Sequence, residues 1–194
     1  MNYPNGKRNN TYNKANNKIS HGNRGQTLEK SIDLTNRYYI NENIAIIHKK
    51  PTPIQIVDVH YPSRDKATIK EAYFKVPSTT DYNGIYKGKY IDFEAKETRN
   101  KTSFPFINIH PHQVNHMKQC YEHDGIVFLI IKFTLHDEIF FIPFDFFNNY
   151  WTNYMNGGRK SIPYKEIKLH CHLIKESINP RINYIQVINK IYSL

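Results

Sequence analysis

The stretch Ile91-Asp92-Phe93-Glu94-Ala95-Lys96 decides the fold, because apolar and charged side chains alternate along it. Alternation with a period of two is typical of a β-strand that has one face on a core. The apolar members would face that core, while Asp92, Glu94 and Lys96 share the opposite face. Two carboxylates and an ammonium are costly to bury without partners. Metal coordination, or exposure of an ordinary charged face to solvent, would explain why the strand keeps them.

Another carboxylate, Asp81, lies one predicted strand earlier. Residues 81–86 are expected to pair with the stretch above through the turn Lys87-Gly88-Lys89, and this hairpin would bring Asp81 near Glu94. Carboxylate oxygens are ligands that Mg²⁺ prefers, and bound Mg²⁺ activates water and neutralises charge on a phosphate. Lys96, on the same face, can stabilise negative charge in a transition state. The group suits hydrolysis of a phosphodiester, although a solvated strand would have the same spacing.

Outward from this hairpin, hydrophobic periodicity and turn residues predict an α/β sheet flanked by helices. A polar turn joins residues 54–61 to residues 68–76, which predicts a long hairpin. The predicted elements are a helix at 27–39 capped by Thr27, strands at 44–47, 54–61, 68–76, 81–86 and 90–96, a helix at 111–122, strands at 126–132 and 138–144, a helix from Asp145 to residue 154, a loop at 156–161, and a helix at 184–192.

The chain has 194 residues, a length that predicts one domain with a flexible extension. Residues 1–26 contain no acidic group, carry five basic ones and have few apolar side chains, so we expect a flexible basic arm before a domain at 27–194. Two cysteines cannot form a disulfide scaffold, and the apolar runs are too short to span a bilayer. These features lead us to expect a soluble, cytoplasmic protein that does not enter membranes.

The formal net charge is +10 and the isoelectric point is about 9.4. A basic surface of this kind attracts polyanions such as nucleic acid or an anionic membrane. It serves equally well to keep a protein soluble. Zinc is not expected, because the histidines at 110, 112 and 116 and the run His170-Cys171-His172 do not follow the paired spacing of structural zinc sites. Nothing nearby predicts that Cys120 or Cys171 is a nucleophile.

Several longer stretches resemble one known family. They are Asn23-Arg24-Gly25 with Thr27-Leu28-Glu29, His48-Lys49-Lys50-Pro51-Thr52-Pro53, Lys70-Glu71-Ala72-Tyr73-Phe74-Lys75, the run from Ser78 to Gly88, the run from Ile91 to Thr98, Lys101-Thr102-Ser103-Phe104-Pro105, and Pro180-Arg181-Ile182. On these stretches the chain resembles the RecU family of bacterial Holliday junction resolvases, from about Asn23 almost to the C-terminus.

This resemblance implies a type II restriction-endonuclease-like (PD-(D/E)XK) core with a mixed sheet, acting as a homodimer. It implies symmetric nicking of a four-way DNA junction with Mg²⁺, for which Mn²⁺ can substitute. Transferred to matching positions, the metal ligands would be Thr79, Asp81, Glu94 and Gln113, with Lys96 as stabiliser of the transition state. Asp92 would lie beside the metal rather than bind it, and Glu29 would either do the same or be a surface or capping residue.

The long hairpin at 54–76 would correspond to the family's protruding stalk, which enters the junction centre. Residues there suited to phosphate contact are Arg64, Lys66, Lys70 and Lys75. Tyr73 would stack on exposed bases or simply pack the stalk. Arg24 is the candidate DNA contact of the arm. A recombinase and a branch-migration helicase are candidate protein partners.

The main hypothesis is therefore a Mg²⁺-dependent, junction-selective endonuclease of homologous recombination and DNA repair. The alternative is a DNA-binding, strand-annealing and recombinase-modulating protein in which cleavage is secondary. A sequence-specific nuclease resembling restriction enzymes is a third hypothesis.

Overall fold

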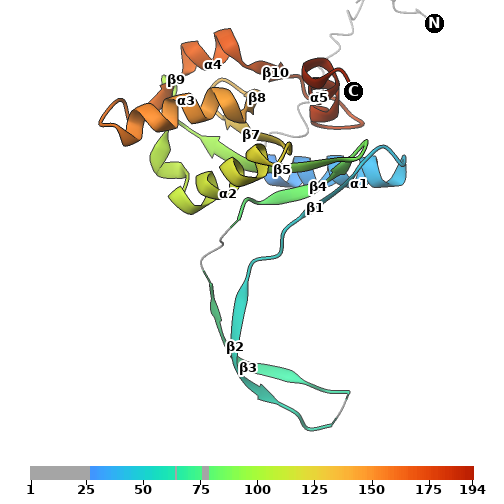
Figure 1. Ribbon diagram of the computed structural model, residues 1–194. Coiled ribbons are helices and arrows are strands. Elements are labelled where there is room, and N and C mark those ends of the chain that lie inside the picture. The colour runs from blue at the N-terminus through green and yellow to red at the C-terminus, as the bar shows by residue number, and fades with distance from the viewer. Residues whose placement is uncertain (1–26, 64, 76–78) are drawn as a thin grey trace, which may run out of the picture.

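The computed structural model describes residues 27–63, 65–75 and 79–194. The expected arm at 1–26, with Arg24, and Arg64 on the long hairpin lie outside the described residues. Figure 1 shows a layered body of sheet and helices, from which the hairpin of strands β2 and β3 projects.

The elements follow in the order α1 (Leu28–Asn41), β1 (Ile46–Lys49), β2 (Ile54–His60), β3 (Thr68–Phe74), β4 (Tyr82–Tyr86), β5 (Lys89–Thr98), β6 (Ser103–Pro105), the 3₁₀ helix η1 (Phe106–Asn108), α2 (Pro111–Glu122), β7 (Ile126–Phe133), β8 (Glu138–Pro143), α3 (Phe144–Met155), β9 (Ser161–Pro163), α4 (Tyr164–His170), β10 (His172–Ile174) and α5 (Tyr184–Tyr192).

The main sheet has six strands in the order β1-β4-β5-β7-β8-β10. Strands β5 and β7 pair in parallel, while every other neighbouring pair in this sheet is antiparallel. The parallel pair is connected through α2, as expected for two parallel neighbours that need a crossover. The prediction of an α/β fold with a mixed sheet flanked by helices is confirmed at this level.

Both faces of the sheet carry an apolar core. On one face, side chains of β5, β7 and β8 pack with α1 and α5; on the other, side chains of β7 and β8 pack with α2, α3 and α4. On the first face, the Phe128 ring stacks between Phe93 and Phe141, with ring centroids 4.7 and 4.2 Å away. Full burial of such a side chain contributes roughly 2–3 kcal/mol. The first core holds one face of β5, whose opposite face carries the candidate site.

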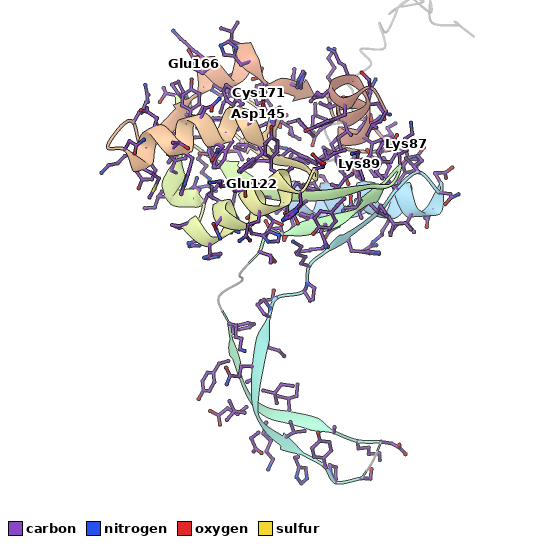
Figure 2. All side chains as sticks on the ribbon, in the orientation of Figure 1. Lys87, Lys89, Glu122, Asp145, Glu166 and Cys171 are labelled. Atoms are coloured by element: carbon purple, nitrogen blue, oxygen red, sulfur yellow. The ribbon has the colours of Figure 1, made fainter. Side chains whose placement is uncertain are left out.

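The β2–β3 hairpin is a separate two-stranded sheet with a register shift near Asp58. Nearly all its side chains are exposed on both faces, and no helix of the body covers it (Figure 2). At its base, the main-chain N–H of Lys75 donates to the carbonyl of Pro53 at 2.9 Å. Isolated two-stranded hairpins are marginally stable in water, so this one depends on its attachment to the body.

Most expected elements are present with shifted ends. Helix α2 and helix α5 have the predicted bounds, and the Thr27 hydroxyl caps α1, accepting from the N–H of Lys30. The prediction that Asp145 caps the next helix was wrong, because α3 begins at Phe144 with Pro143 as its N-cap residue. Within the described ranges, no helix has the length and apolar character needed to cross a membrane.

The sequence did not predict five short elements, namely β6, η1, β9, α4 and β10. Strands β6 and β9 pair with each other, and β10 pairs with β8. The three strands have three residues each, so their stability comes from partners distant in the chain and not from a local pattern.

Candidate active site

Strand β5 places Asp92, Glu94 and Lys96 on one face, opposite the core formed with α1 and α5. That face is not solvated, because helix α2 packs over it, and both Asp92 and Glu94 are fully buried. The alternative of an ordinary strand with a solvated charged face was therefore wrong. Two carboxylates remain inside the protein only if polar partners surround them.

Asp81 lies directly before β4, whose pairing of Tyr82 with Phe93 places Asp81 beside Glu94. The main-chain N–H of Asp81 donates to Oε2 of Glu94 at 3.1 Å. Oδ2 of Asp81 accepts from the N–H of Ala95 at 3.4 Å and lies 3.8 Å from Nζ of Lys96. Lys96 also forms a close ion pair with Oε1 of Glu94. The structure thus brings Asp81, Glu94 and Lys96 together.

Helix α2 contributes Gln113 to the same cluster. Its amide nitrogen donates to Oε1 of Glu94 at 2.8 Å, and its amide oxygen accepts from the main-chain N–H of His110 at 3.1 Å. The second contact belongs to a capping box at the start of α2, where Pro111 is the first helical residue. The cap therefore fixes Gln113 against Glu94. Thr79, two residues before Asp81 in the chain, is half-buried, and its hydroxyl donates to the carbonyl of Thr80 at 3.4 Å.

The two carboxylates oppose each other electrostatically. Burial, followed by the nearby charge of Asp81, raises the pKa of Glu94 to about 8, and the Lys96 ammonium only partly offsets this. A divalent cation between the oxygens would supply the positive charge that this pair lacks. Hard oxygen donors of this kind fit Mg²⁺, so the residues present are consistent with the metal that the sequence predicts.

A shallow cavity of about 330 Å³ opens beside the cluster and includes Glu29, Asp81, Lys96 and Glu97 in its lining. Glu29 pairs with Lys49 at the surface. Glu97 accepts from the N–H of Leu28 at the start of α1. Glu97 was not among the predicted site residues; it directly follows Lys96 on β5, so its side chain faces the other side of the strand.

Asp92 belongs to a second polar group beside the first. Its Oδ2 accepts from Nζ of Lys50 at 2.8 Å and from the Tyr90 hydroxyl at 3.0 Å. Oδ1 accepts from the Thr80 hydroxyl, and Nε2 of His116 lies 3.2 Å from Oδ2. Asp92 thus lies next to the cluster without reaching Asp81. Lys50 was not among the predicted site residues, although its place at the end of the first short strand is visible in the sequence.

Three residues with possible metal-binding atoms also meet here, since the ligand atoms of Asp92, His116 and Cys120 lie within 4.8 Å of one another. Lys50 already supplies a positive charge at this point, which disfavours a second cation. Burial raises the pKa of the Cys120 thiol, and burial raises that of Cys171 to about 12. Both thiols are therefore protonated at neutral pH, as expected for cysteines that are not nucleophiles.

The candidate DNA contacts on the hairpin lie apart from this cluster. Lys66, Lys70, Tyr73 and Lys75 are all exposed, and Tyr73 donates its hydroxyl to Glu71. The hairpin that carries them extends away from the body, and Lys75 lies at its base (Figure 1). Arg24 and Arg64 are not among the described residues.

Comparison with known proteins gives consistent results. Residues 23–190 match the family model described as Recombination protein U, RecU. A Holliday junction resolvase RecU of Bacillus cytotoxicus is 54% identical, with 98% of this chain and 97% of the relative covered. A protein of the same description from Staphylococcus saprophyticus is 52% identical, with 98% of this chain and 96% of the relative covered.

Proposed function

Because the chain belongs to the RecU family and is a Holliday junction resolvase, an endonuclease, we propose that it nicks two opposed strands of a four-way DNA junction symmetrically, with Mg²⁺ as its cofactor. The cellular processes are homologous recombination and DNA repair. The observation that carries this proposal is the convergence of Asp81, Glu94 and Lys96 beside an open cavity.

Asp81 and Glu94 would hold the metal through carboxylate oxygens. Thr79 and Gln113 would complete the ligand set. For Gln113 this requires its amide to turn, so that oxygen instead of nitrogen faces Glu94. The support for a metal here is the buried carboxylate pair, whose ionised form is disfavoured without an added cation.

Bound Mg²⁺ would supply a more acidic water and neutralise charge that builds on the scissile phosphate. Lys96 lies within reach of both carboxylates. From there its ammonium would stabilise the negative charge that develops on the phosphate in the transition state. The main-chain N–H of Asp81 and the β4–β5 pairing would keep Glu94 in place. Mn²⁺, which accepts the same oxygen ligands, would substitute for Mg²⁺.

The proposal also assigns a role to each larger part of the molecule. The sheet with β4, β5 and α2 would be a restriction-endonuclease-like core, and the β2–β3 hairpin would be the stalk that enters the junction. A homodimer with two-fold symmetry would present two identical sites to two opposed strands. Lys66, Lys70, Lys75 and Tyr73 would contact DNA on the stalk, together with Arg64, while Arg24 would contact it from the arm.

A synthetic four-way junction tests the proposal directly. Wild-type protein with Mg²⁺ is expected to give paired, symmetric nicks, and a linear duplex of the same sequence is expected to remain intact. Glu94→Gln is expected to bind the junction without nicking it. Cleavage that survives this substitution would contradict the assigned site, and equal cleavage of linear duplex would favour a sequence-specific nuclease.

A DNA-binding, strand-annealing and recombinase-modulating role is the second candidate function. The exposed basic and aromatic side chains of the hairpin support it, because they lie away from the cluster. Lys96→Ala separates the two functions, since it should abolish nicking and leave junction binding intact. If cells that carry Lys96→Ala repair DNA normally, binding is the main role.

A further inference from the structure

We infer that Lys50 is a positioning residue that couples the base of the β2–β3 hairpin to the carboxylate of Asp81. Lys50 follows β1 directly, at the point where the chain leaves the six-stranded sheet toward the hairpin. Its ammonium contacts Thr80 and Asp92, so one side chain joins three segments of the chain. The inference rests on the proposed function, because that function assigns Asp81 to the metal site.

Main-chain contacts establish the first link. The N–H of Lys50 donates to the carbonyl of Asp81 at 2.7 Å, which continues the β1–β4 pairing beyond Lys49 and Tyr82. Lys50 is on the leg that leaves toward the hairpin, and Asp81 follows the leg that returns from it. A displacement of the hairpin base therefore acts on both ends of this hydrogen bond.

Side-chain contacts establish the second link. Nζ of Lys50 donates to Oγ1 of Thr80 at 2.9 Å and to Oδ2 of Asp92 at 2.8 Å. Thr80 is almost fully buried and donates its own hydroxyl to Asp92. Since Thr80 directly precedes Asp81, these bonds limit the main-chain angles that Asp81 can adopt.

Lys50 supplies the ammonium that pairs with Asp92, whose Oδ2 also lies 3.2 Å from Nε2 of His116. Asp92 is fully buried, and a buried carboxylate that loses its cation is strongly destabilising. The other ammonium on this face belongs to Lys96, which pairs with Glu94. This face of β5 therefore carries two carboxylates that pair with different lysines, and of these pairs the Glu94–Lys96 pair lies in the proposed catalytic cluster.

The physical consequence is a division between binding and cleavage. Lys50 has a side chain that is only 18% exposed and directed at Asp92, so it adds little to the basic surface that attracts DNA. Its loss would move Asp81 relative to Glu94 without changing the hairpin's exposed lysines. Cleavage and the response to Mg²⁺ would suffer, while binding of the junction would not.

Lys50→Met is the variant that tests this inference. Junction binding is measured in EDTA by fluorescence anisotropy, and single-turnover cleavage is measured across a Mg²⁺ titration. We expect an unchanged Kd in EDTA, a cleavage rate lowered by about 100-fold, as for a displaced catalytic group, and a raised half-saturating Mg²⁺ concentration. Lys168→Met is the matched control. Lys168 lies on helix α4, away from the site, and it also pairs with a carboxylate, that of Glu138, at 3.0 Å.

The double variant Lys50→Met/Asp92→Asn removes both charges of the buried pair. It should fold and recover about tenfold of the lost cleavage rate, because the unpaired carboxylate is gone. A Lys50→Met protein that cleaves normally would overturn the inference. A second result would also overturn it. If Lys50→Met lost junction binding in EDTA as strongly as it lost cleavage, and the double variant did not recover the cleavage rate, Lys50 would be a DNA contact.

Two further outcomes keep the test decisive. If Lys50→Met does not fold, the double variant alone decides, because an unchanged half-saturating Mg²⁺ concentration in it would overturn the inference. Wild-type protein that leaves the junction intact would contradict the proposed function itself. Wild-type cleavage with an unaffected Lys50→Met variant would contradict the role of Lys50 alone.

Discussion

Gln113 and Glu94 are joined by a hydrogen bond of 2.8 Å from the amide nitrogen to Oε1. One helical turn further along α2, His116 lies 3.2 Å from Asp92 in the same way. Residues three apart on a helix share a face, as do residues two apart on a strand. The contacts Gln113–Glu94 and His116–Asp92 therefore hold one face of helix α2 against one face of strand β5 and enclose the buried acidic side chains.

Gln113→Leu should weaken both the fold and the site. The substitution removes the donor to Glu94 and the acceptor for the His110 N–H, so the free energy of unfolding should fall by about 1–3 kcal/mol. Cleavage should fall as Glu94 loses its support. Urea denaturation and junction cleavage measure the two effects. Gln119→Leu, at an exposed position on the same helix, should leave both unchanged.

Glu94→Gln should change how the stability of the metal-free protein depends on pH. Burial raises the pKa of Glu94 to about 8, so the folded protein keeps a proton that the unfolded chain releases at lower pH. The stabilising contribution is complete below the unfolded pKa and is lost as pH rises through the folded pKa. Wild-type stability should therefore fall by up to about 1.4 kcal/mol per pH unit between about pH 5 and 8.

The variant lacks this titration, so its stability should be flatter over the same range. Urea unfolding in EDTA at the two ends of the range measures the difference, and Glu122→Gln, exposed at the end of α2, is the control. Parallel curves for wild type and Glu94→Gln would show that Glu94 is already ionised without metal. Added Mg²⁺ should recover more stability in wild type than in the variant.

Local patterns account for the parts of the molecule that sequence predicted. Alternation along 91–96 and hairpin spacing to Asp81 were sufficient to bring Asp81, Glu94 and Lys96 together, because these residues are near one another in the chain. Helix α2 was marked at its start by Pro111 and at its end by Gly125. Strong local signals of this kind need no information about distant partners.

Long-range partners account for what was missed. Lys50 contacts Asp92, but the β2–β3 hairpin lies between the two residues in the sequence, and no periodic pattern links residues so far apart in the chain. The burial of Asp92 was also not predictable, because it depends on α2 folding back over β5. Short strands such as β10 form only when β8 is present beside them.

Gly84→Ala should separate β1 from β4. A Cβ atom at Gly84 would lie 2.1 Å from the carbonyl oxygen of Ile46 and 2.6 Å from Cα of Ile47, and both atoms belong to the main chain. Because the neighbouring backbone must move, we expect a loss of roughly 1–3 kcal/mol in the free energy of unfolding. Cleavage should fall too, because Lys50 directly follows β1 and a displaced β1 would weaken its hydrogen bond to the carbonyl of Asp81.

Gly88→Ala is the comparison for this effect. Gly88 has a φ of +76° and open space around it, so alanine there adds backbone strain of about 1 kcal/mol but no clash. It lies at the far end of β4 from Asp81, and cleavage should be unaffected. Equal loss of cleavage in both variants would mean that general destabilisation, and not the β1–β4 contact, limits the reaction.

Neutralising the hairpin lysines should reduce the salt dependence of junction binding. Lys66, Lys70 and Lys75 are exposed, and each phosphate contact contributes about 0.9 to the slope of log K against log salt concentration. The triple substitution to Gln should therefore lower the slope by about 2 to 3 if all three contact phosphates. Binding isotherms between about 50 and 200 mM salt measure it.

The same change made on the body separates local contact from net charge. Lys160, Lys165 and Lys168 are also exposed and lie at or near helix α4, away from the hairpin (Figure 1). Their triple substitution to Gln alters the net charge of the protein equally but should leave the slope almost unchanged, because counterions are released only where phosphates are contacted. Equal slopes for the two triple variants would show that the hairpin lysines act through the overall charge and do not touch the junction.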